Sequence, residues 1–274
     1  MRQEYHQVIQ EFLSIRAPQN RLVPFAFRPS QQKYSISCSN RDLILKPRKL
    51  GFTTMAIAEG FVRASISGQL CAILAHTDKR VKEFLSVAKF IYSHMPDSMK
   101  PRVRQDNVTT FSFAATDGSM LIGTASAREF GRGATYHFVH GSEAAWWKPG
   151  DDYNTFRAVS ESVPPDGCIV LESTANGRGG LFFDLWQQAI SGGEYKAHFF
   201  PWWEGNFYTI ENMTWELLQR QRPLDEQESQ LVARFNLDAG QIAWRRQAIT
   251  RLGEKFSQEY PEDDISAFLS SGSP

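Results

Sequence analysis

The segment that most constrains this chain is an apolar run followed by a basic loop, a single glycine and the start of a helical pattern. The run covers residues 43–45, the basic loop residues 46–51, and Thr53 and Thr54 precede the helical pattern. This order predicts a strand, a phosphate-binding loop and a helix, because such a loop turns backbone N–H groups and a helix N-terminus toward a polyphosphate. We call residues 46–54 the phosphate loop.

The loop departs from the usual G-x-x-x-x-G-K-[ST] pattern. Gly51 matches the second glycine and Thr53 the hydroxyl that reaches Mg²⁺, but Lys46 replaces the first glycine and Phe52 the lysine. The basic residues that could instead meet the β/γ-phosphate charge of ATP are Lys46, Arg48 and Lys49. The alternative is an ordinary strand-to-helix turn with solvated basic side chains.

Charge and hydropathy exclude two broad classes. The 274 residues carry 30 Lys+Arg and 30 Asp+Glu, so no overall basic field indicates nucleic-acid binding, and any DNA contact must come from a local patch. Residues 100–104 form the most basic cluster outside the phosphate loop, although they are equally well explained as solvated. No apolar run approaches the ~20 residues of a membrane-spanning helix, so we expect no membrane partner.

The remaining pattern alternates between strand-like and helix-like segments, which is typical of an α/β sandwich around a mostly parallel sheet. An amphipathic helix is expected within residues 1–20 and a mainly helical subdomain within residues 199–274, after a core formed by residues 1–198. The other expected elements are strands 70–75, 134–140 and 167–171, a helix over 78–94, and a hairpin of residues 109–113 and 119–123 around Asp117 and Gly118.

A carboxylate follows the expected strand that ends at His140. In a phosphate-loop ATPase, an acidic pair at such a strand end orders Mg²⁺ and takes a proton from the attacking water. Here Ser142 takes the first place and Glu143 the second, so the base is present and the metal carboxylate is not. A solvated Glu143 is the simpler alternative. A zinc site of His137, His140 and Glu143 is disfavoured, since strand residues three apart point to opposite faces, so the two histidines could not easily share a metal.

Two further segments carry short polar side chains. Ser173, Thr174 and Asn176 follow a buried strand, where hydroxyl and amide groups can sense a γ-phosphate or simply form a turn. Upstream of the phosphate loop, Gln31 could pair with adenine through its amide, or begin a helix after Pro29.

Taken in order, these segments resemble the ATPase domain of the large terminase subunit, the DNA-packaging motor of tailed phages. The resemblance includes the phosphate loop, residues 142–145, residues 173–177, and the tail of residues 256–261 with Ala267 and Phe268. It implies an α/β phosphate-loop NTPase of the ASCE type, with a mostly parallel sheet flanked by helices. The nuclease domain that normally follows in this family would begin about where the sequence stops, so we expect the motor half alone.

The resemblance also implies roles for individual residues. ATP would lie on the phosphate loop with Thr53 on Mg²⁺, Glu143 polarising water, and Ser173, Thr174 and Asn176 coupling hydrolysis to movement. Arg132 is the candidate arginine finger, reaching into a neighbouring subunit's site, and Arg128 is its rival; a structural salt bridge is the alternative for Arg132. The residues implied to bind the nucleotide are Gln31, Lys46, Arg48, Lys49, Gly51, Phe52, Thr53 and Thr54.

The implied function is ATP-driven translocation of double-stranded viral DNA into a procapsid. Its partners would be double-stranded DNA, the portal protein and the small terminase subunit, with a homo-oligomeric ring when active and a monomer in isolation. It would act in the host cell cytoplasm, at the procapsid portal. The alternatives are a helicase-like DNA-dependent ATPase and a nucleotide-binding docking module without turnover.

Overall fold

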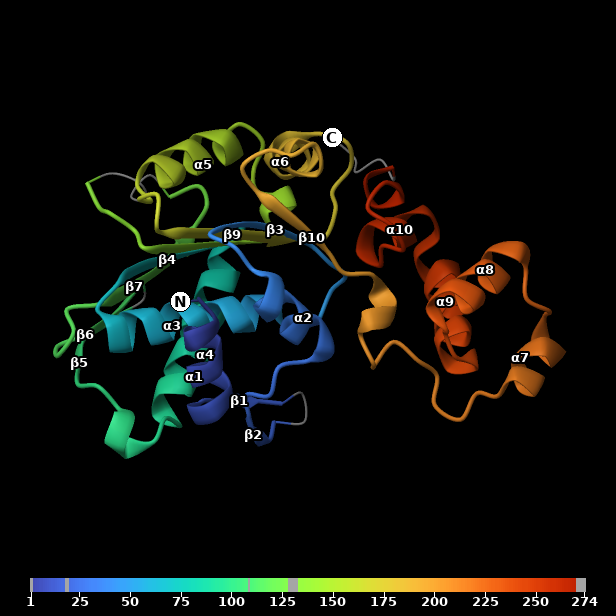
Figure 1. Ribbon diagram of the computed structural model, residues 1–274, viewed down its shortest axis with the longest axis horizontal. Helices are drawn as coiled ribbons and strands as arrows, with labels where there is room; N and C mark the ends of the chain where they lie inside the picture. Colours follow the sequence, from blue (N-terminus) through green and yellow to red (C-terminus); the bar gives the residue numbers. More distant parts are fainter. Residues whose placement is uncertain (1, 18–19, 108, 128–132, 270–274) are drawn as a thin grey trace.

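The computed structural model describes residues 2–17, 20–107, 109–127 and 133–269, which fold around an eight-stranded sheet (Figure 1). A separate two-stranded sheet pairs β1 (Ser14–Arg16) with β2 (Leu22–Pro24). From one edge to the other, the strands of the large sheet are β10 (Lys196–Phe199), β3 (Arg41–Leu45), β9 (Cys168–Ser173), β8 (Phe138–Ser142), β4 (Leu70–Ala75), β7 (Ser119–Thr124), β6 (Thr110–Phe113) and β5 (Val103–Asp106).

The sheet is mostly parallel, as the alternating pattern predicts. Every neighbouring pair from β10 to β7 is parallel, and only β6 runs antiparallel to its neighbours β7 and β5. The predicted hairpin is confirmed: β6 and β7 pair on either side of Asp117, whose φ of 58° lies in the left-handed region that tight turns require. The carboxyl ends of the central parallel strands therefore lie at one edge of the sheet.

Helices cover both faces of the sheet (Figure 1). The two helices on one face are α5 (Asp151–Glu161) and α6 (Gly180–Ile190). The four on the other face are α1 (Arg2–Phe12), α2 (Pro29–Ser37), α3 (Phe52–Ser67) and α4 (Asp78–Ser93). The helix predicted over residues 78–94 is α4, and α3 is the helix predicted after the phosphate loop. A separate apolar core fills the space on each side of the sheet.

Several predicted elements have different bounds, among them the strand predicted over 167–171, which is β9 and ends at Ser173. The first helix, expected within residues 1–20, covers Arg2–Phe12, and the residues that follow it form β1, which pairs with β2. The strand predicted over 134–140 is β8, which begins only at Phe138, since the N–H of Tyr136 bonds to the carbonyl of Ser162 away from the sheet.

A mainly helical region follows β10. Its helices are α7 (Trp215–Gln221), α8 (Glu226–Phe235), α9 (Ala239–Leu252) and α10 (Phe256–Glu259). The short 3₁₀ helices of the chain are η1 (Asp97–Met99), η2 (Ala144–Trp146), η3 (Trp202–Glu204), η4 (Gly253–Lys255) and η5 (Ser266–Phe268). The last of these returns to the sheet, because the ring of Phe268 packs against Phe183 and Trp186 of α6. The boundary expected near residue 199 stays a prediction.

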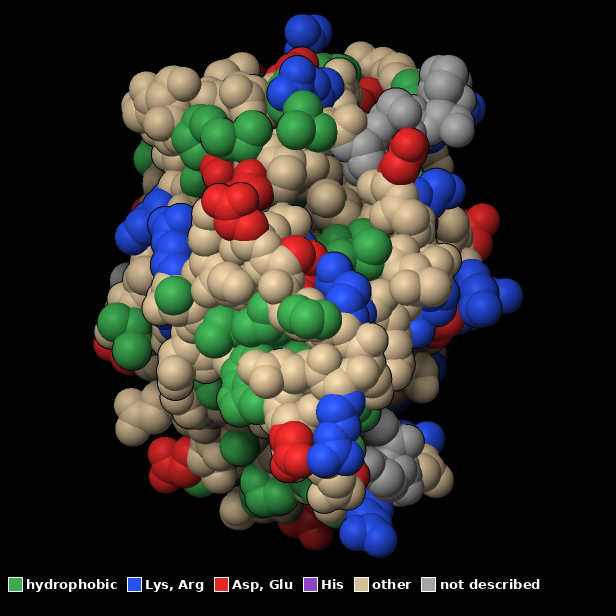
Figure 2. Space-filling model, turned by 90° about the vertical axis from the view of Figure 1, so that its right-hand side faces the viewer, with side chains coloured by type: hydrophobic (Ala, Val, Ile, Leu, Met, Phe, Trp, Pro, Cys, Tyr) green, Lys and Arg blue, Asp and Glu red, His purple; other side chains and the backbone are tan. Residues whose placement is uncertain are grey.

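The end of the molecule that carries this helical region has a mixed surface. Figure 2 shows basic and acidic side chains scattered among hydrophobic ones over that face. Within the part of the chain that the structure describes, each helix is too short or too polar to cross a bilayer.

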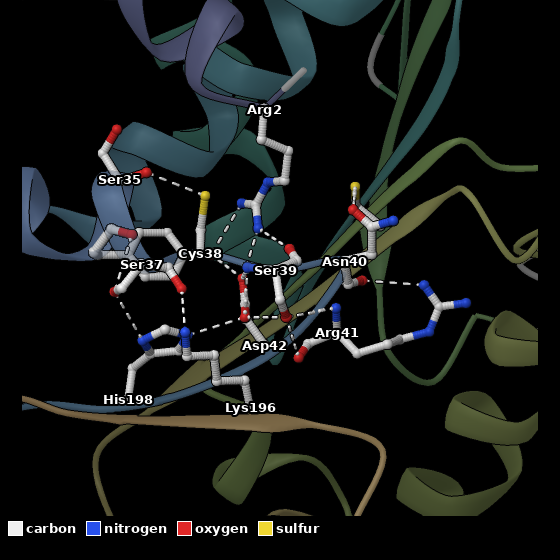
Figure 3. Close-up of polar contacts among 12 residues, drawn as sticks. Arg2, Ser35, Ser37, Cys38, Ser39, Asn40, Arg41, Asp42, Lys196 and His198 are labelled. Atoms are coloured by element: carbon white, nitrogen blue, oxygen red, sulfur yellow. Dashed lines mark hydrogen bonds and ion pairs between the residues drawn. The ribbon is translucent and has the colours of Figure 1, made fainter.

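A group of buried polar side chains ties α1 and α2 to β3 and β10 (Figure 3). We call Arg2, Tyr34, Asp42, Glu59 and His198 the N-terminal cluster. The Arg2 guanidinium donates to Asp42 Oδ2 at 2.6 Å and to both carboxylate oxygens of Glu59. His198 Nε2 lies 2.9 Å from Asp42 Oδ1. These bonds position the strand that leads into the phosphate loop.

Candidate active site

The carboxyl ends of three adjacent strands, β3, β9 and β8, bring the site together. Lys46 follows β3, Thr174 follows β9 and Glu143 follows β8. The ammonium Nζ of Lys46 lies 3.0 Å from Glu143 Oε1 and 2.9 Å from Oε2 of Glu172. Residues far apart in the sequence thus meet where parallel sheets commonly bind ligands.

The backbone of the phosphate loop is held by side chains from outside it. Gly51 has φ 86°, and a Cβ atom there would lie 3.1 Å from Gln31 Nε2, so both conformation and space favour glycine. Gln31 Nε2 donates to the carbonyl of Gly51 at 2.9 Å, and Arg28 donates to that of Lys49 at 2.6 Å. The hydroxyl of Tyr208 donates to the carbonyl of Arg48. With these carbonyls held, the loop enters α3 in one defined conformation.

The basic residues of the loop have different environments. Lys46 is buried and faces the two carboxylates, whereas Lys49 is exposed with φ 65°. Arg48 is ion-paired with Glu259 of α10, on the helical region. Of the three candidates for the displaced loop lysine, Lys46 is therefore the one positioned inside the site.

Phe52 and Gln31 are engaged by the protein itself. The ring of Phe52 packs against Phe200 and Tyr34 in the core, which leaves only its backbone to face a nucleotide. The Gln31 amide donates to Gly51, and its Oε1 accepts the N–H of Arg28 as part of the cap of α2. A contact between Gln31 and adenine stays a prediction, and it would have to share or exchange these hydrogen bonds.

The hydroxyls of Thr53 and Ser142 converge on Glu172. Thr53 Oγ1 donates to Glu172 Oε1 at 2.6 Å, and Ser142 Oγ donates to the same oxygen at 2.8 Å. Ser142 and Glu172 are direct partners in the register of β8 and β9, so their side chains share one face of the sheet. Thr54, the third residue of α3, is half-buried. The carboxylate missing at position 142 therefore has a counterpart on the adjacent strand.

Charge pairing dominates the electrostatics of this group. Burial alone would raise the pKa of the Glu172 carboxyl, but the neighbouring Lys46 ammonium holds it below its ordinary value. Burial would likewise lower the pKa of Lys46, and the carboxylates of Glu143 and Glu172 outweigh it and raise that pKa. Lys46 and Glu172 are thus both charged at neutral pH.

Glu143 occupies a backbone conformation that is uncommon for its residue type. Its φ of 50° and ψ of 49° lie in the left-handed region, at the turn from β8 into η2. The turn directs the carboxylate toward Lys46 and toward the segment after β9. There, Ser173 Oγ lies 3.4 Å and the N–H of Thr174 3.3 Å from Glu143 Oε2.

The predicted coupling residues are in contact with this turn. Asn176 Nδ2 donates to the carbonyl of Ala145 at 2.9 Å, and the indole N–H of Trp146 donates to Thr174 Oγ1 at 2.9 Å. Ser173 Oγ also accepts the N–H of Ala145. The segment after β9 therefore contacts both the carboxylate and the backbone that presents it.

The two histidines of the zinc alternative have different partners. His137 Nδ1 accepts the N–H of Leu70 at 3.4 Å, whereas His140 Nε2 lies 3.6 Å from Glu172 Oε1.

The candidate fingers Arg128 and Arg132 lie outside the described residues.

Basic residues 100–104 lie at the edge of the sheet opposite β10, where they lead into β5. Lys100 and Arg104 are ion-paired with Asp97 and Asp117 respectively. These local pairs reduce the positive charge that the segment presents to a ligand.

Glu172 is the site residue that the sequence prediction missed. Its signal was a charged residue at the end of an otherwise apolar strand, since carboxylates are almost never fully buried unless paired.

Comparison with known proteins rests on structure. Compared by sequence, the chain matches no protein-family model and no curated protein at a significant level. By structure, it matches the large terminase ATPase domain of a Thermus phage with a TM-score of 0.55 and 14% identity, over 93% of this chain and 99% of that one. The large terminase of bacteriophage HK97 matches with a TM-score of 0.65 and 12% identity. The chain has the fold of a large terminase ATPase domain.

The two large terminase matches differ in extent. The match to the HK97 protein covers 99% of this chain and 54% of that chain. The match to the Thermus phage ATPase domain covers nearly the whole of both. The predicted resemblance to a large terminase ATPase domain is thus confirmed at the level of the fold.

Proposed function

We propose that this chain is an ATPase that drives double-stranded viral DNA into a procapsid. The observation that carries the proposal is the convergence of Lys46, Glu143 and Thr174 at three adjacent strand ends, beside a glycine-containing loop and the start of α3, within a large terminase ATPase fold. A phosphate loop, a carboxylate base and a polar segment in contact with that base are the parts that phosphoryl transfer needs.

The residues present fit ATP and Mg²⁺. The start of α3 and the backbone of the loop favour bound phosphate, and the buried Lys46 supplies a cation. Thr53 at the second position of α3 is the hydroxyl placed to hold Mg²⁺, which when bound neutralises charge on the β- and γ-phosphates. Arg48 reaches the phosphates only by leaving Glu259.

Glu143 is the general base of this proposal. In the structure its Oε1 accepts a hydrogen bond from Lys46, so this oxygen is not free to face a water. A nucleotide whose phosphates attract Lys46 would release Glu143 toward the attacking water. Ser173 and Thr174, which contact the same carboxylate, would sense that release and couple it to movement of the chain.

The remaining partners follow from the same proposal. They are double-stranded DNA, the portal protein, the small terminase subunit and further copies of this chain in a ring, acting at the procapsid portal in the host cytoplasm. Arg132 is proposed as the finger that one copy inserts into the site of the next, with Arg128 as its rival. Such a finger typically contributes about 10³- to 10⁵-fold in rate.

Steady-state ATP hydrolysis against protein concentration tests this function. The samples are the wild type, Glu143→Ala, Arg132→Ala and a mixture of the two variants, with Glu194→Gln as a matched surface control, since Glu194 is largely exposed. Hydrolysis by the wild type and by Glu194→Gln should rise more than linearly with protein concentration. It should be absent in Glu143→Ala and in Arg132→Ala, and should partly return when these two variants are mixed. Full activity in Arg132→Ala would exclude the finger. Absent turnover with bound nucleotide would favour the docking module, and strand separation a helicase.

A further inference from the structure

The most deeply buried carboxylate of the site has no role in the mechanism above. Glu172 is 0% exposed, and its Oε1 accepts hydrogen bonds from Thr53 and Ser142. Its Oε2 lies 2.9 Å from Lys46 Nζ but has no directed hydrogen bond among the described residues. Oε1 is thus fixed beside the hydroxyl of Thr53, which we propose holds Mg²⁺. The charge of Oε2 is neutralised only by Lys46, which the phosphates of a nucleotide would attract.

The charges of the site do not balance. Glu143 and Glu172 share Lys46 as their cation, and the other close neighbours of Glu172 are hydroxyls and the imidazole of His140. If Lys46 moves to a phosphate, the carboxylate of Glu172 remains buried without a counterion, which is strongly unfavourable in a protein interior. A second cation is then required next to Thr53.

We infer that Glu172 is the carboxylate that orients Mg²⁺ at Thr53, in place of the acidic residue absent at position 142. The inference rests on the proposed function, because it concerns the metal that accompanies ATP. Direct register between Ser142 and Glu172 puts the carboxylate one strand away from the expected position but on the same face. The function lost from β8 is supplied by β9.

The chemistry of the ligand set agrees with Mg²⁺. The described residues contain no cluster of three histidine, cysteine or acidic side chains that could hold a metal by themselves. Mg²⁺ does not need one, since it is usually bound by one or two carboxylates together with waters and the phosphates of a nucleotide. Thr53 and Glu172, with a bound phosphate, form such a set.

The competing interpretation is that Glu172 serves only as a counterion for Lys46. The two interpretations differ in whether nucleotide affinity depends on metal. For the full chain, the test measures the Kd of fluorescent ADP with Mg²⁺ and with EDTA, and free Mn²⁺ by electron paramagnetic resonance in the presence of ADP. The variants are Glu172→Gln, Ser142→Asp with Glu172→Gln, and Glu194→Gln as the control.

Glutamine retains an oxygen that can accept from Thr53 and Ser142 but lacks the charge. We expect the wild type and Glu194→Gln to bind ADP more tightly with Mg²⁺ than with EDTA. Glu172→Gln should reduce the ratio of the two Kd values toward one and weaken Mn²⁺ binding about 10- to 100-fold. Adding Ser142→Asp should restore both, because a carboxylate returns to the same face of the sheet.

Several outcomes would overturn the inference. If Glu172→Gln has the same ratio of Kd with EDTA to Kd with Mg²⁺ as the wild type, Glu172 serves only as a counterion. The same conclusion follows if the variant loses ADP binding equally with Mg²⁺ and with EDTA. ADP binding by the wild type without any effect of metal would also refute the metal role while leaving a nucleotide site. Failure of the wild type to bind ADP under both conditions would refute the proposed function and this inference together.

Discussion

Two groups of charged side chains are buried on the same side of the sheet, near opposite ends of β3. In the N-terminal cluster, every N–H donor of the Arg2 guanidinium has an acceptor, and both oxygens of Asp42 accept several bonds. At the carboxyl end, both ring nitrogens of the buried His140 have no hydrogen-bond partner among the described residues, and Oε2 of Glu172 has only its ion pair with Lys46.

The charges differ in the same way. In and beside the N-terminal cluster, Arg2 and Arg63 match Asp42 and Glu59. At the carboxyl end, Lys46 faces both Glu143 and Glu172. A saturated, balanced group stabilises the fold, whereas an unsaturated group with excess negative charge is suited to exchange partners with a ligand. Burial alone does not distinguish the two kinds.

The same substitution in each group should have the largest difference in effect. Glu59 and Glu172 are both almost completely buried, at 1% and 0% exposed. Glu59→Gln should lower the free energy of unfolding by about 3 to 5 kcal/mol, because it leaves Arg2 and Arg63 short of a buried partner. Glu172→Gln should change it by less than about 1 kcal/mol, since Lys46 keeps Glu143 and the hydroxyls keep an acceptor.

Urea unfolding at pH 7 measures both values, with Glu194→Gln as the exposed control. Equal losses at positions 59 and 172 would contradict the distinction between the two groups.

Acid should affect both groups, and the sign follows from the lowered pKa values of Asp42, Glu59 and Glu172. Burial opposes each shift, and the paired cations and hydrogen bonds outweigh it. These carboxylates stabilise the folded state above their unfolded pKa values, about 4, and that contribution is lost as pH falls toward the folded values. Urea unfolding from pH 7 to pH 3 should give a shallower fall for Glu172→Gln than for the wild type. Identical slopes would mean that Glu172 is not held charged by Lys46.

Ser142→Asp should sharpen the difference in charge. The new carboxylate would lie against Glu172, because the serine oxygen is only 2.8 Å from Glu172 Oε1. We expect a loss of about 1 to 2 kcal/mol in unfolding free energy without ligand. Mg²⁺ and ADP together should recover more of that loss than ADP with EDTA, as measured by thermal unfolding. Equal recovery under both conditions would argue against a metal beside Glu172.

The smallest effect is expected at the ion pair between the loop and the tail. Arg48 is largely exposed, and exposed pairs contribute about 0 to 1 kcal/mol. Glu259→Gln should therefore change the unfolding free energy by less than about 1 kcal/mol in urea. A loss above about 2 kcal/mol would show that this pair belongs with the structural group instead.

Much of the fold and part of the site could be predicted from sequence. Lys46, the carboxylate Glu143 and the polar residues from Ser173 each follow an apolar run that the sequence pattern identifies as a strand. Parallel pairing then places those ends at one edge, which the structure confirms.

The rest depends on contacts that sequence order does not contain. Glu172 could not be linked to Thr53 without knowing that β9 lies between β3 and β8. The roles of Arg48 and Phe52 depend on side-chain packing against the helical region and Phe200. The late start of β8 depends on a backbone bond from Tyr136 to Ser162, more than twenty residues away.

The contacts of Arg48 have a reciprocal consequence. Its side chain is bonded to Glu259 and its carbonyl to Tyr208, while the tail beyond α10 is anchored to α6 through Phe268. If a bound nucleotide moves Arg48, it changes the stability of the tail's contacts. Linkage is reciprocal, so a partner that binds and fixes the tail must change the affinity for nucleotide by the same factor as nucleotide changes the affinity for that partner. Slower hydrogen exchange of residues 256–268 in the presence of ADP would reveal such coupling. Unchanged exchange would show that the phosphate loop and the tail are not coupled. The stability of α10 and η5 would then depend on whether nucleotide is bound, although neither helix contacts the nucleotide.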